Sequence, residues 1–409
     1  MDNIRINGER LWQSLMEMAL IGATRRGGNC RLALTELDRE GRDLFVRWCK
    51  EAGCRVSVDS MGNIFARRPG RQDVAPVGAG SHLDTQPTGG KYDGVYGVLA
   101  ALEVVRTLND YGVETDAPVE IAMWTNEEGA RFAPAMVASG VFAGAFELDY
   151  GHSRTDQDGV SIGEALKNIG YLGEQPCGGR PFRAFFEAHI EQGPILEVEG
   201  ETIGVVTGAQ GQYWYNVSVT GFESHAGTTP MDRRRDALVA AARLVTEVQA
   251  IALAHPPHAV STVGMLEARP GSRNTIPGQV SFSVDLRHPE QAILDAMDQR
   301  LNVAVAHIRD DSGCEVTLER IWHSPPVVFD ADCVAAVREG AVKAGLAHRD
   351  MVSGAGHDAC YINRVAPTAM IFVPCKDGIS HNETEEAKPE DLAAGCDVLL
   401  HAILDRAEG

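Results

Sequence analysis

The feature that most constrains the fold of this chain is an alternation of short apolar runs with amphipathic segments, separated by glycine- and proline-rich turns. The apolar runs predict strands at 56–58, 63–66, 77–81, 119–124 and 183–190. Helical patterns are predicted before these strands, over 7–54, and between two of them, over 95–112. This order is typical of an α/β fold, in which ligands bind beyond the carboxyl ends of the strands.

The pattern changes near Gln212. From there to Pro325, alternating strands and two helical segments, over 232–252 and 291–309, make two strand–helix–strand passes. Such passes are typical of a small antiparallel α+β domain. The α/β pattern then returns, so the 409-residue chain is predicted to have two nested domains, with 212–328 inserted between 1–211 and 329–409.

Charge and cysteine usage exclude several classes of protein. Thirty-seven basic and 57 acidic residues give a net charge of −20, so the chain lacks the positive charge that binding to nucleic acid or to an anionic membrane requires. We see neither a signal-peptide pattern nor an apolar run long enough to span a bilayer, and expect a soluble, cytoplasmic protein. The nine cysteines form no CxxC pair, which favours reduced, mostly buried thiols.

Polar residues follow the strand predicted at 77–81. His82 comes directly after it, Asp84 could orient the imidazole, and Asp93 lies between two glycine-rich turns. A histidine with its second ring nitrogen held, and a carboxylate nearby, are typical ligands of a divalent metal. Taken alone, each motif is equally consistent with a polar strand end or a surface turn.

Two adjacent carboxylates, Glu127 and Glu128, follow the strand predicted at 119–124. Because adjacent side chains at a strand end diverge, one can bind a metal while the other faces the substrate as a general base. A solvated acidic loop is the alternative for such a pair. The placement, equivalent to that of His82, favours function.

Two further polar positions complete the set. His189 and Gln192 lie at the end of the strand predicted at 183–190, and His381 lies in a polar loop near the C-terminus. With His82, Asp93 and Glu128, the two histidines can supply ligands for two divalent ions roughly 3.5–4 Å apart that share Asp93.

In this order, the motifs GSHLDT, GGKYDG, TNEEGARF, EAHIEQGP, ESHAGTTPM and SHNE resemble those of the two-metal amidohydrolases of the aminoacylase and carboxypeptidase superfamily. They most resemble the branch of N-carbamoyl-L-amino-acid hydrolases, allantoate amidohydrolases and ureidopropionases. The resemblance covers nearly the whole chain. It implies a catalytic α/β/α domain with a mixed sheet, interrupted by a ferredoxin-like α+β lid and dimerisation domain.

The resemblance also implies roles for individual residues. Glu127 would be the base, and each subunit would bind two divalent ions, Zn, Mn, Co or Ni. The implied metal ligands are His82, Asp93 (bridging), Glu128, His189 and His381. His225 of the lid would reach the site of the partner subunit in a homodimer and stabilise the oxyanion. The implied substrate-binding residues are Gln192, His225, Asn274, Arg287 and Gly356.

Arg287 would pair with the carboxylate of the substrate, and a salt bridge to Asp285 is the alternative. The expected reaction is hydrolysis of the carbamoyl group of a small ureido acid, an N-carbamoyl-L-amino acid, to the L-amino acid, ammonia and carbon dioxide. Trp214 stands where allantoate hydrolases tend to have a basic residue, and it favours a small or apolar side chain unless it belongs to the domain core.

Several alternatives stay open. They are an allantoate amidohydrolase, a β-ureidopropionase, whose substrate differs by a methylene worth only ~1–3 kcal/mol, and a catalytically silent binding protein on the same fold. A peptidase is less favoured, because His189 stands where many two-metal peptidases of the superfamily have an acidic ligand. The intact set of Glu127 and five ligand positions argues against a silent protein.

Overall fold

The computed structural model describes residues 4–408, which form two compact units. Unit 1 contains the chain up to Thr207 and from Phe329 onward, and unit 2 contains Gly208–Val328. The predicted mixed α/β class is confirmed. Among the described residues, no helix is long and apolar enough to cross a membrane.

A mixed sheet has the order β1-β2-β4-β3-β5-β16-β6-β14, and β15 also pairs with β6. Its strands belong to unit 1, except β14 and the last two residues of β6, which lie at the ends of the unit 2 segment. Its strands are β1 (Arg55–Val58), β2 (Ile64–Arg68), β3 (Val77–His82), β4 (Val119–Trp124), β5 (Ala184–Ile190), β6 (Ile203–Ala209), β14 (Val327–Val328), β15 (His348–Ser353) and β16 (Thr368–Val373). The four central strands β4, β3, β5 and β16 are mutually parallel and buried along their whole length. Such continuous apolar runs are typical of strands covered on both faces.

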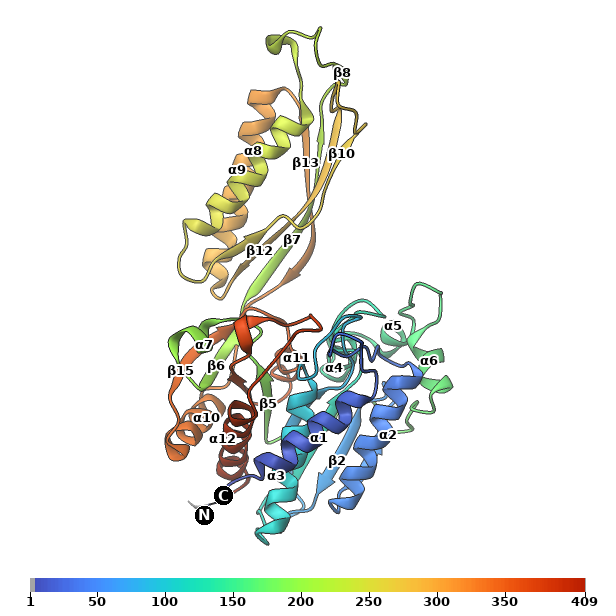
Figure 1. Cartoon of the computed structure of the whole chain (residues 1–409), viewed down its shortest axis with the longest axis vertical. Helices are drawn as coiled ribbons and strands as arrows, with labels where there is room; N and C mark the ends of the chain where they lie inside the picture. The colour runs from blue at the N-terminus through green and yellow to red at the C-terminus, as the bar shows by residue number, and fades with distance from the viewer. Residues whose placement is uncertain (1–3, 409) are drawn as a thin grey trace. The chain divides into compact units, whose positions relative to one another are not determined.

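Helices cover this sheet: α3 packs on β3, β4 and β5, α12 on β16 and β5, and α1 beside α3 and α12 (Figure 1). The helices of unit 1 are α1 (Gly8–Leu20), α2 (Glu36–Glu51), α3 (Val95–Asp110), α4 (Val137–Phe142), α5 (Leu148–His152), α6 (Ile162–Asn168), α7 (Ile195–Glu199), α10 (Ala331–Ala344), α11 (Asp358–Ile362), the 3₁₀ turn η2 (Lys376–Gly378) and α12 (Pro389–Ala407). The helical patterns predicted within 7–54 correspond to α1 and α2, and the chain between these helices is not helical because Gly22 and Gly27 take left-handed φ values of 85° and 90°.

Unit 2 is an antiparallel sheet in the order β10-β12-β7-β13, with β9 paired to β12 and a separate ribbon of β8 and β11. Its elements are β7 (Gly211–Thr220), β8 (Ser224–His225), η1 (Met231–Arg233), α8 (Ala237–Leu253), β9 (Val260–Thr262), β10 (Leu266–Arg269), β11 (Thr275–Ile276), β12 (Gln279–His288), α9 (Gln291–Ser312) and β13 (Glu315–Ser324).

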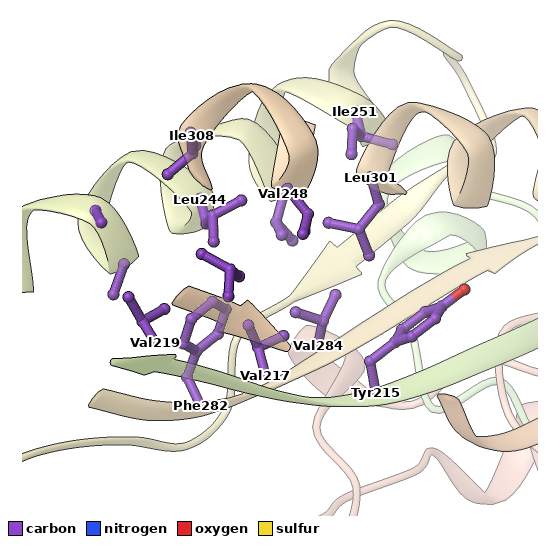
Figure 2. Close-up of a cluster of buried hydrophobic side chains, with 14 of the residues drawn as sticks. Tyr215, Val217, Val219, Leu244, Val248, Ile251, Phe282, Val284, Leu301 and Ile308 are labelled. Carbon is purple, nitrogen blue, oxygen red and sulfur yellow. The ribbon is translucent and has the colours of Figure 1, made fainter. Parts of the chain in front are cut away.

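The core of unit 2 lies between this sheet and the helices α8 and α9 (Figure 2). Burial alternates along β7, so that Tyr215, Val217 and Val219 point into the core while every second residue faces away. Trp214 is one of the outward residues and is 39% exposed. The interpretation of Trp214 as a core residue is therefore wrong.

Candidate metal centre

The four parallel strands of unit 1 end at one edge of the sheet, and a candidate site residue lies at or after the end of each. His82 ends β3, His189 lies near the end of β5, Glu127 and Glu128 follow β4, and His381 follows β16 after a short turn. Topology alone therefore brings together residues that are up to 299 positions apart (82 to 381). This edge is where open α/β sheets bind their ligands.

A first group of possible metal ligands consists of His82, Asp93 and His189, all buried. The Oδ1 atom of Asp93 lies 3.1 Å from Nε2 of His189 and 3.7 Å from Nε2 of His82. Asp93 reaches this position because Gly94, with a φ of 68°, starts α3 directly behind it. A Cβ atom on Gly94 would lie 2.2 Å from the His82 ring, so only glycine fits.

A second group shares Asp93 and adds Glu128 and His381. Nε2 of His381 lies 3.4 Å from Oδ2 of Asp93 and 3.4 Å from Oε2 of Glu128. His381 is half exposed, whereas the other two residues are more than nine-tenths buried as side chains. The two oxygens of Asp93 thus face different ligand groups, as a bridging carboxylate requires.

The hydrogen bonds of the two buried histidines fit a cation. Nδ1 of His82 lies 2.9 Å from the backbone carbonyl of Asp84, and Nδ1 of His189 lies 2.9 Å from that of Ile190. Because a carbonyl can only accept, each Nδ1 carries a proton, and in the neutral form of each ring the lone pair of Nε2 lies on the side of Asp93. Nε2 of His189 also accepts the backbone N–H of Gly94 at 3.2 Å. Lone pairs that face a carboxylate oxygen at 3.1 and 3.7 Å repel unless a positive charge lies between them.

The pKa values of the two buried histidines are also consistent with a cation between them and Asp93. Burial lowers the pKa of His82 to about 4. Burial also acts to lower the pKa of His189, but the hydrogen bond and the charge of Asp93 outweigh it and raise that pKa to about 9. Without metal, a proton on His189 would supply the missing positive charge, and bound metal would displace that proton.

Glu127 faces the first ligand group, with Oε2 at 3.4 Å from Nε2 of His82. Burial raises its pKa well above the usual range, and the charges of Asp358 and Glu128 raise it further. The backbone amides of Glu127 and Glu128 donate to the two carboxylate oxygens of Asp84, each at 3.2 Å. Asp84 therefore joins the loop that carries Glu127 to the end of β3.

Two predicted substrate-binding residues also lie in unit 1. Nε2 of Gln192 donates to Oδ2 of Asp93 at 2.9 Å, while its Oε1 is buried without a hydrogen-bond partner among residues 4–408. Gly356 lies against Met136, since a Cβ atom there would be 2.7 Å from the Met136 methyl group. The amide of Met136 in turn donates to the carbonyl of Glu127 at 2.7 Å.

The other predicted substrate-binding residues lie in unit 2. His225 and Asn274 are neighbours, because β8 pairs with β11 and the Ala226 amide donates to the Asn274 carbonyl at 2.9 Å. The guanidinium of Arg287 pairs with Asp285, with NH2 at 2.7 Å and Nε at 3.0 Å from Oδ2. This is the salt bridge to Asp285 that the sequence analysis gave as the alternative for Arg287.

Sequence reasoning missed two residues that contact the Asp93 loop, Ser380 and Glu385. The hydroxyl of Ser380 lies 2.8 Å from Oδ2 of Asp93, and Glu385 is buried beneath the backbone of Tyr92 and Asp93. Glu385 lies in the acidic stretch Glu383–Glu386, which is typical of a solvated loop. The one sequence signal for Glu385 is that it closely follows His381 in the same polar segment.

An α/β sheet that delivers histidines and carboxylates to one edge defines a class of candidate metal-dependent hydrolases. A family model described as peptidase family M20/M25/M40 matches residues 78–405, and the chain belongs to this family.

Named relatives extend over the whole chain. An N-carbamoyl-L-amino-acid amidohydrolase of Rhizobium meliloti is 53% identical over 408 residues, covering 100% of this chain and 98% of the relative. An allantoate amidohydrolase of Bacillus subtilis is 35% identical and covers 94% of each chain. The solved structure of an amidase of the hydantoinase/carbamoylase family from Burkholderia multivorans has a TM-score of 0.97 and 63% identity, covering 99% of this chain and 98% of that one. The family that the sequence motifs predicted is confirmed.

Proposed function

We propose that this chain is a metal-dependent amidohydrolase that removes the carbamoyl group of N-carbamoyl-L-amino acids and releases the L-amino acid, ammonia and carbon dioxide. The observation that carries the proposal is the buried Glu127 beside two ligand groups that share Asp93. The substrate class is supported by the Rhizobium relative, which is named for this activity and is 53% identical over its length.

Two divalent ions per subunit would be held by the two ligand groups, with Asp93 between them. The ligand types accept Zn, Mn, Co or Ni. When bound, the ions would polarise the ureido carbonyl and make an attacking water more acidic. Glu127 is the base in this proposal: it takes a proton from the attacking water and passes it to the leaving nitrogen.

His225 is proposed to donate a hydrogen bond to the oxyanion. Its Nδ1 atom accepts from the amides of Gly227 and Thr228, at 3.0 and 3.2 Å, so the proton of the neutral ring is on Nε2. His225 is exposed, and its Nε2–H is the donor that an oxyanion requires. We propose that two chains form a homodimer through unit 2, with His225 serving the site of the partner.

The substrate would be held by Gln192, Asn274, Arg287 and the backbone of Gly356. Arg287 would bind the substrate carboxylate and must then share its guanidinium with Asp285. Gln192 has an unpartnered buried acceptor that an N–H of the ureido group would satisfy.

Allantoate is the second candidate substrate, because the Bacillus relative named allantoate amidohydrolase is 35% identical over 94% of the chain. An ammonia-release assay with N-carbamoyl-L-amino acids, their D-enantiomers, allantoate and ureidopropionate, each with Mn or Zn, separates the candidates. If the protein hydrolysed only allantoate, allantoate would replace N-carbamoyl-L-amino acids as the proposed substrate. Absence of ammonia from every compound, with metal bound, would favour the silent binding protein.

Glu127→Gln tests the role of the base. We expect at least a ~100-fold loss of kcat, the usual contribution of a general base, with unchanged metal content, because Glu127 belongs to neither ligand group. Ammonia release and elemental analysis are measured on the same preparation. A variant that retains more than a tenth of the activity would contradict the assignment.

The cytoplasmic location stays a prediction.

A further inference from the structure

Glu385 is a buried carboxylate beneath the loop that carries Asp93. It is 2% exposed, and its Oε1 atom accepts the backbone N–H groups of Tyr92, at 2.9 Å, and Asp93, at 3.2 Å. Its Oε2 atom lies 3.1 Å from the hydroxyl of Ser380, which is itself 2.8 Å from the carboxylate of Asp93. One side chain therefore meets the backbone of the Asp93 loop and a hydroxyl next to the Asp93 side chain.

The loop is shaped to receive this carboxylate. A Cβ atom on Gly90 would lie 2.0 Å from Cδ and from Oε1 of Glu385, so the absence of a side chain at position 90 makes the space that the carboxylate fills. The segment around it, Gly89-Gly90-Lys91-Tyr92-Asp93-Gly94, contains three glycines and has little stiffness of its own. External hydrogen bonds must therefore fix where Asp93 points.

The same carboxylate belongs to the loop that supplies His381, four residues earlier. His381 holds a left-handed φ of 53°, a conformation that costs free energy for a residue other than glycine. Glu385 thus ties the loop of one ligand to the backbone of the other. A buried carboxylate is unfavourable unless it is hydrogen-bonded, and Oε1 of Glu385 meets its two amide donors only when both loops are in place.

We propose that Glu385 is a positioning residue that fixes the bridging Asp93 and couples it to His381, so that it governs affinity for the ion held by Asp93, Glu128 and His381. The inference rests on the two-ion site of the proposed function. It assigns Glu385 no contact with substrate or metal.

The first test measures metal binding to the full chain after removal of metal, by calorimetric titration with Zn or Mn and without substrate. Glu385→Ala is expected to weaken the ion of the second ligand group by about 10- to 100-fold, the usual cost of losing a residue that orients a ligand. Glu385→Gln keeps an acceptor oxygen for the two amides and is expected to stay within about threefold of the parent, by the same reasoning.

The matched control is Glu386→Ala. Glu386 is the next residue, but it is exposed and pairs with Lys376 at 2.7 Å, so its loss should leave both affinities unchanged. Unchanged affinities in Glu385→Ala would overturn the proposal, as would Glu385→Gln being as weak as Glu385→Ala. A parent chain that binds no divalent ion would overturn it too.

A second test disturbs the carboxylate without removing it. Gly90→Ala should displace Glu385 and weaken the same ion, and the double variant Gly90→Ala with Glu385→Ala should bind no more weakly than Glu385→Ala alone. Additive losses would show that Gly90 acts through something other than Glu385 and would overturn the coupling. If Glu385→Ala fails to fold, Gly90→Ala and Glu385→Gln carry the test.

These readouts separate the inference from the proposed function. A parent chain that binds two ions but hydrolyses no ureido acid refutes the function and leaves the Glu385 test valid. A parent chain that hydrolyses its substrate while Glu385→Ala binds both ions normally refutes only the inference.

Discussion

Individual residues around the candidate metal centre adopt backbone conformations that are unfavourable for residues other than glycine. Asn126, Met136, Gln192 and His381 all have φ between 53° and 57°. Each such conformation costs on the order of 1–3 kcal/mol and persists only where the surroundings impose it. The Asn126 side chain shows how, because its Nδ2 donates to the carbonyl of Phe132 at 2.8 Å. Strain is therefore concentrated in the loops that carry Glu127, His381 and Gln192.

Gly94 is the position where a single methyl group should disable the centre. Gly94→Ala adds a Cβ atom 2.2 Å from the His82 ring and also imposes a φ of 68° on alanine. We expect metal affinity to fall at least ~10-fold, because ligand placement is lost. The readout is metal titration together with unfolding by urea.

Gly112→Ala is the control for Gly94→Ala. Gly112 follows the other end of α3 with a φ of 61°, but a Cβ atom there meets no described atom within 4 Å. This variant should lose about 1 kcal/mol of stability from strain and bind metal normally. Equal metal affinity in the two variants would contradict the steric explanation.

At the residue scale, the sequence predicted which candidate ligands lie close together, but not the residues that hold them in place. His82, Glu127 and His189 each lie at or shortly after the end of an apolar strand, and such a strand is recognised from the local sequence pattern. Glu385 could not be found, because its burial depends on Gly90, which is 295 residues away (385 − 90), and nothing local distinguishes it from the solvated Glu386. Arg287 was predicted to pair either with the substrate carboxylate or with Asp285, and its charge alone does not distinguish these two partners.

At the scale of elements, helix α2 holds the loop that carries Glu127 in place. Its Arg42 is buried, pairs with Asp38 at 2.8 Å, and donates to the hydroxyl of Thr125 at 3.2 Å. Thr125 is two residues before Glu127, so an ion pair within one helix fixes the loop after β4. The periodicity of α2 predicted the helix, but not that a charged pair lies on its buried face.

Asp38→Asn should therefore be much more costly than a surface change on the same helix. Removing one partner of a buried pair leaves Arg42 uncompensated, and we expect a loss of about 3–5 kcal/mol in the free energy of unfolding. Glu36→Gln, at the start of α2, breaks the exposed pair with Arg39 and should cost less than about 1 kcal/mol. Urea unfolding of both variants is the measurement, and similar losses would refute the role of the buried pair.

At the scale of the whole molecule, the candidate metal ligands and the core of unit 2 belong to different bodies. All five candidate ligands lie in unit 1, whereas unit 2 has its own apolar core between α8, α9 and its sheet. Ligands stabilise only the body that binds them. The change of sequence pattern near Gln212 predicted an inserted domain, but a sequence pattern does not say which residues lie close together in space.

Metal removal should consequently destabilise one unit only. In calorimetry of the full chain, we expect two transitions, of which one moves to higher temperature when Zn or Mn is restored after chelation. At an ion concentration 100 times the dissociation constant, the expected stabilisation is ~2.7 kcal/mol. Two transitions that shift together, or a single transition, would contradict the independence of the units.

The place of β16 in the sheet has a consequence for how the protein is made. β16 lies between β5 and β6, and His381 follows it, yet both are synthesised after the whole of unit 2. While the ribosome is still producing unit 2, the first 207 residues have a gap in their sheet between β5 and β6 and lack the candidate ligand His381. Unit 2, whose segment is continuous, can fold first. The second group of candidate ligands is thus complete only at the end of translation, and a chain that stops before residue 381 lacks it.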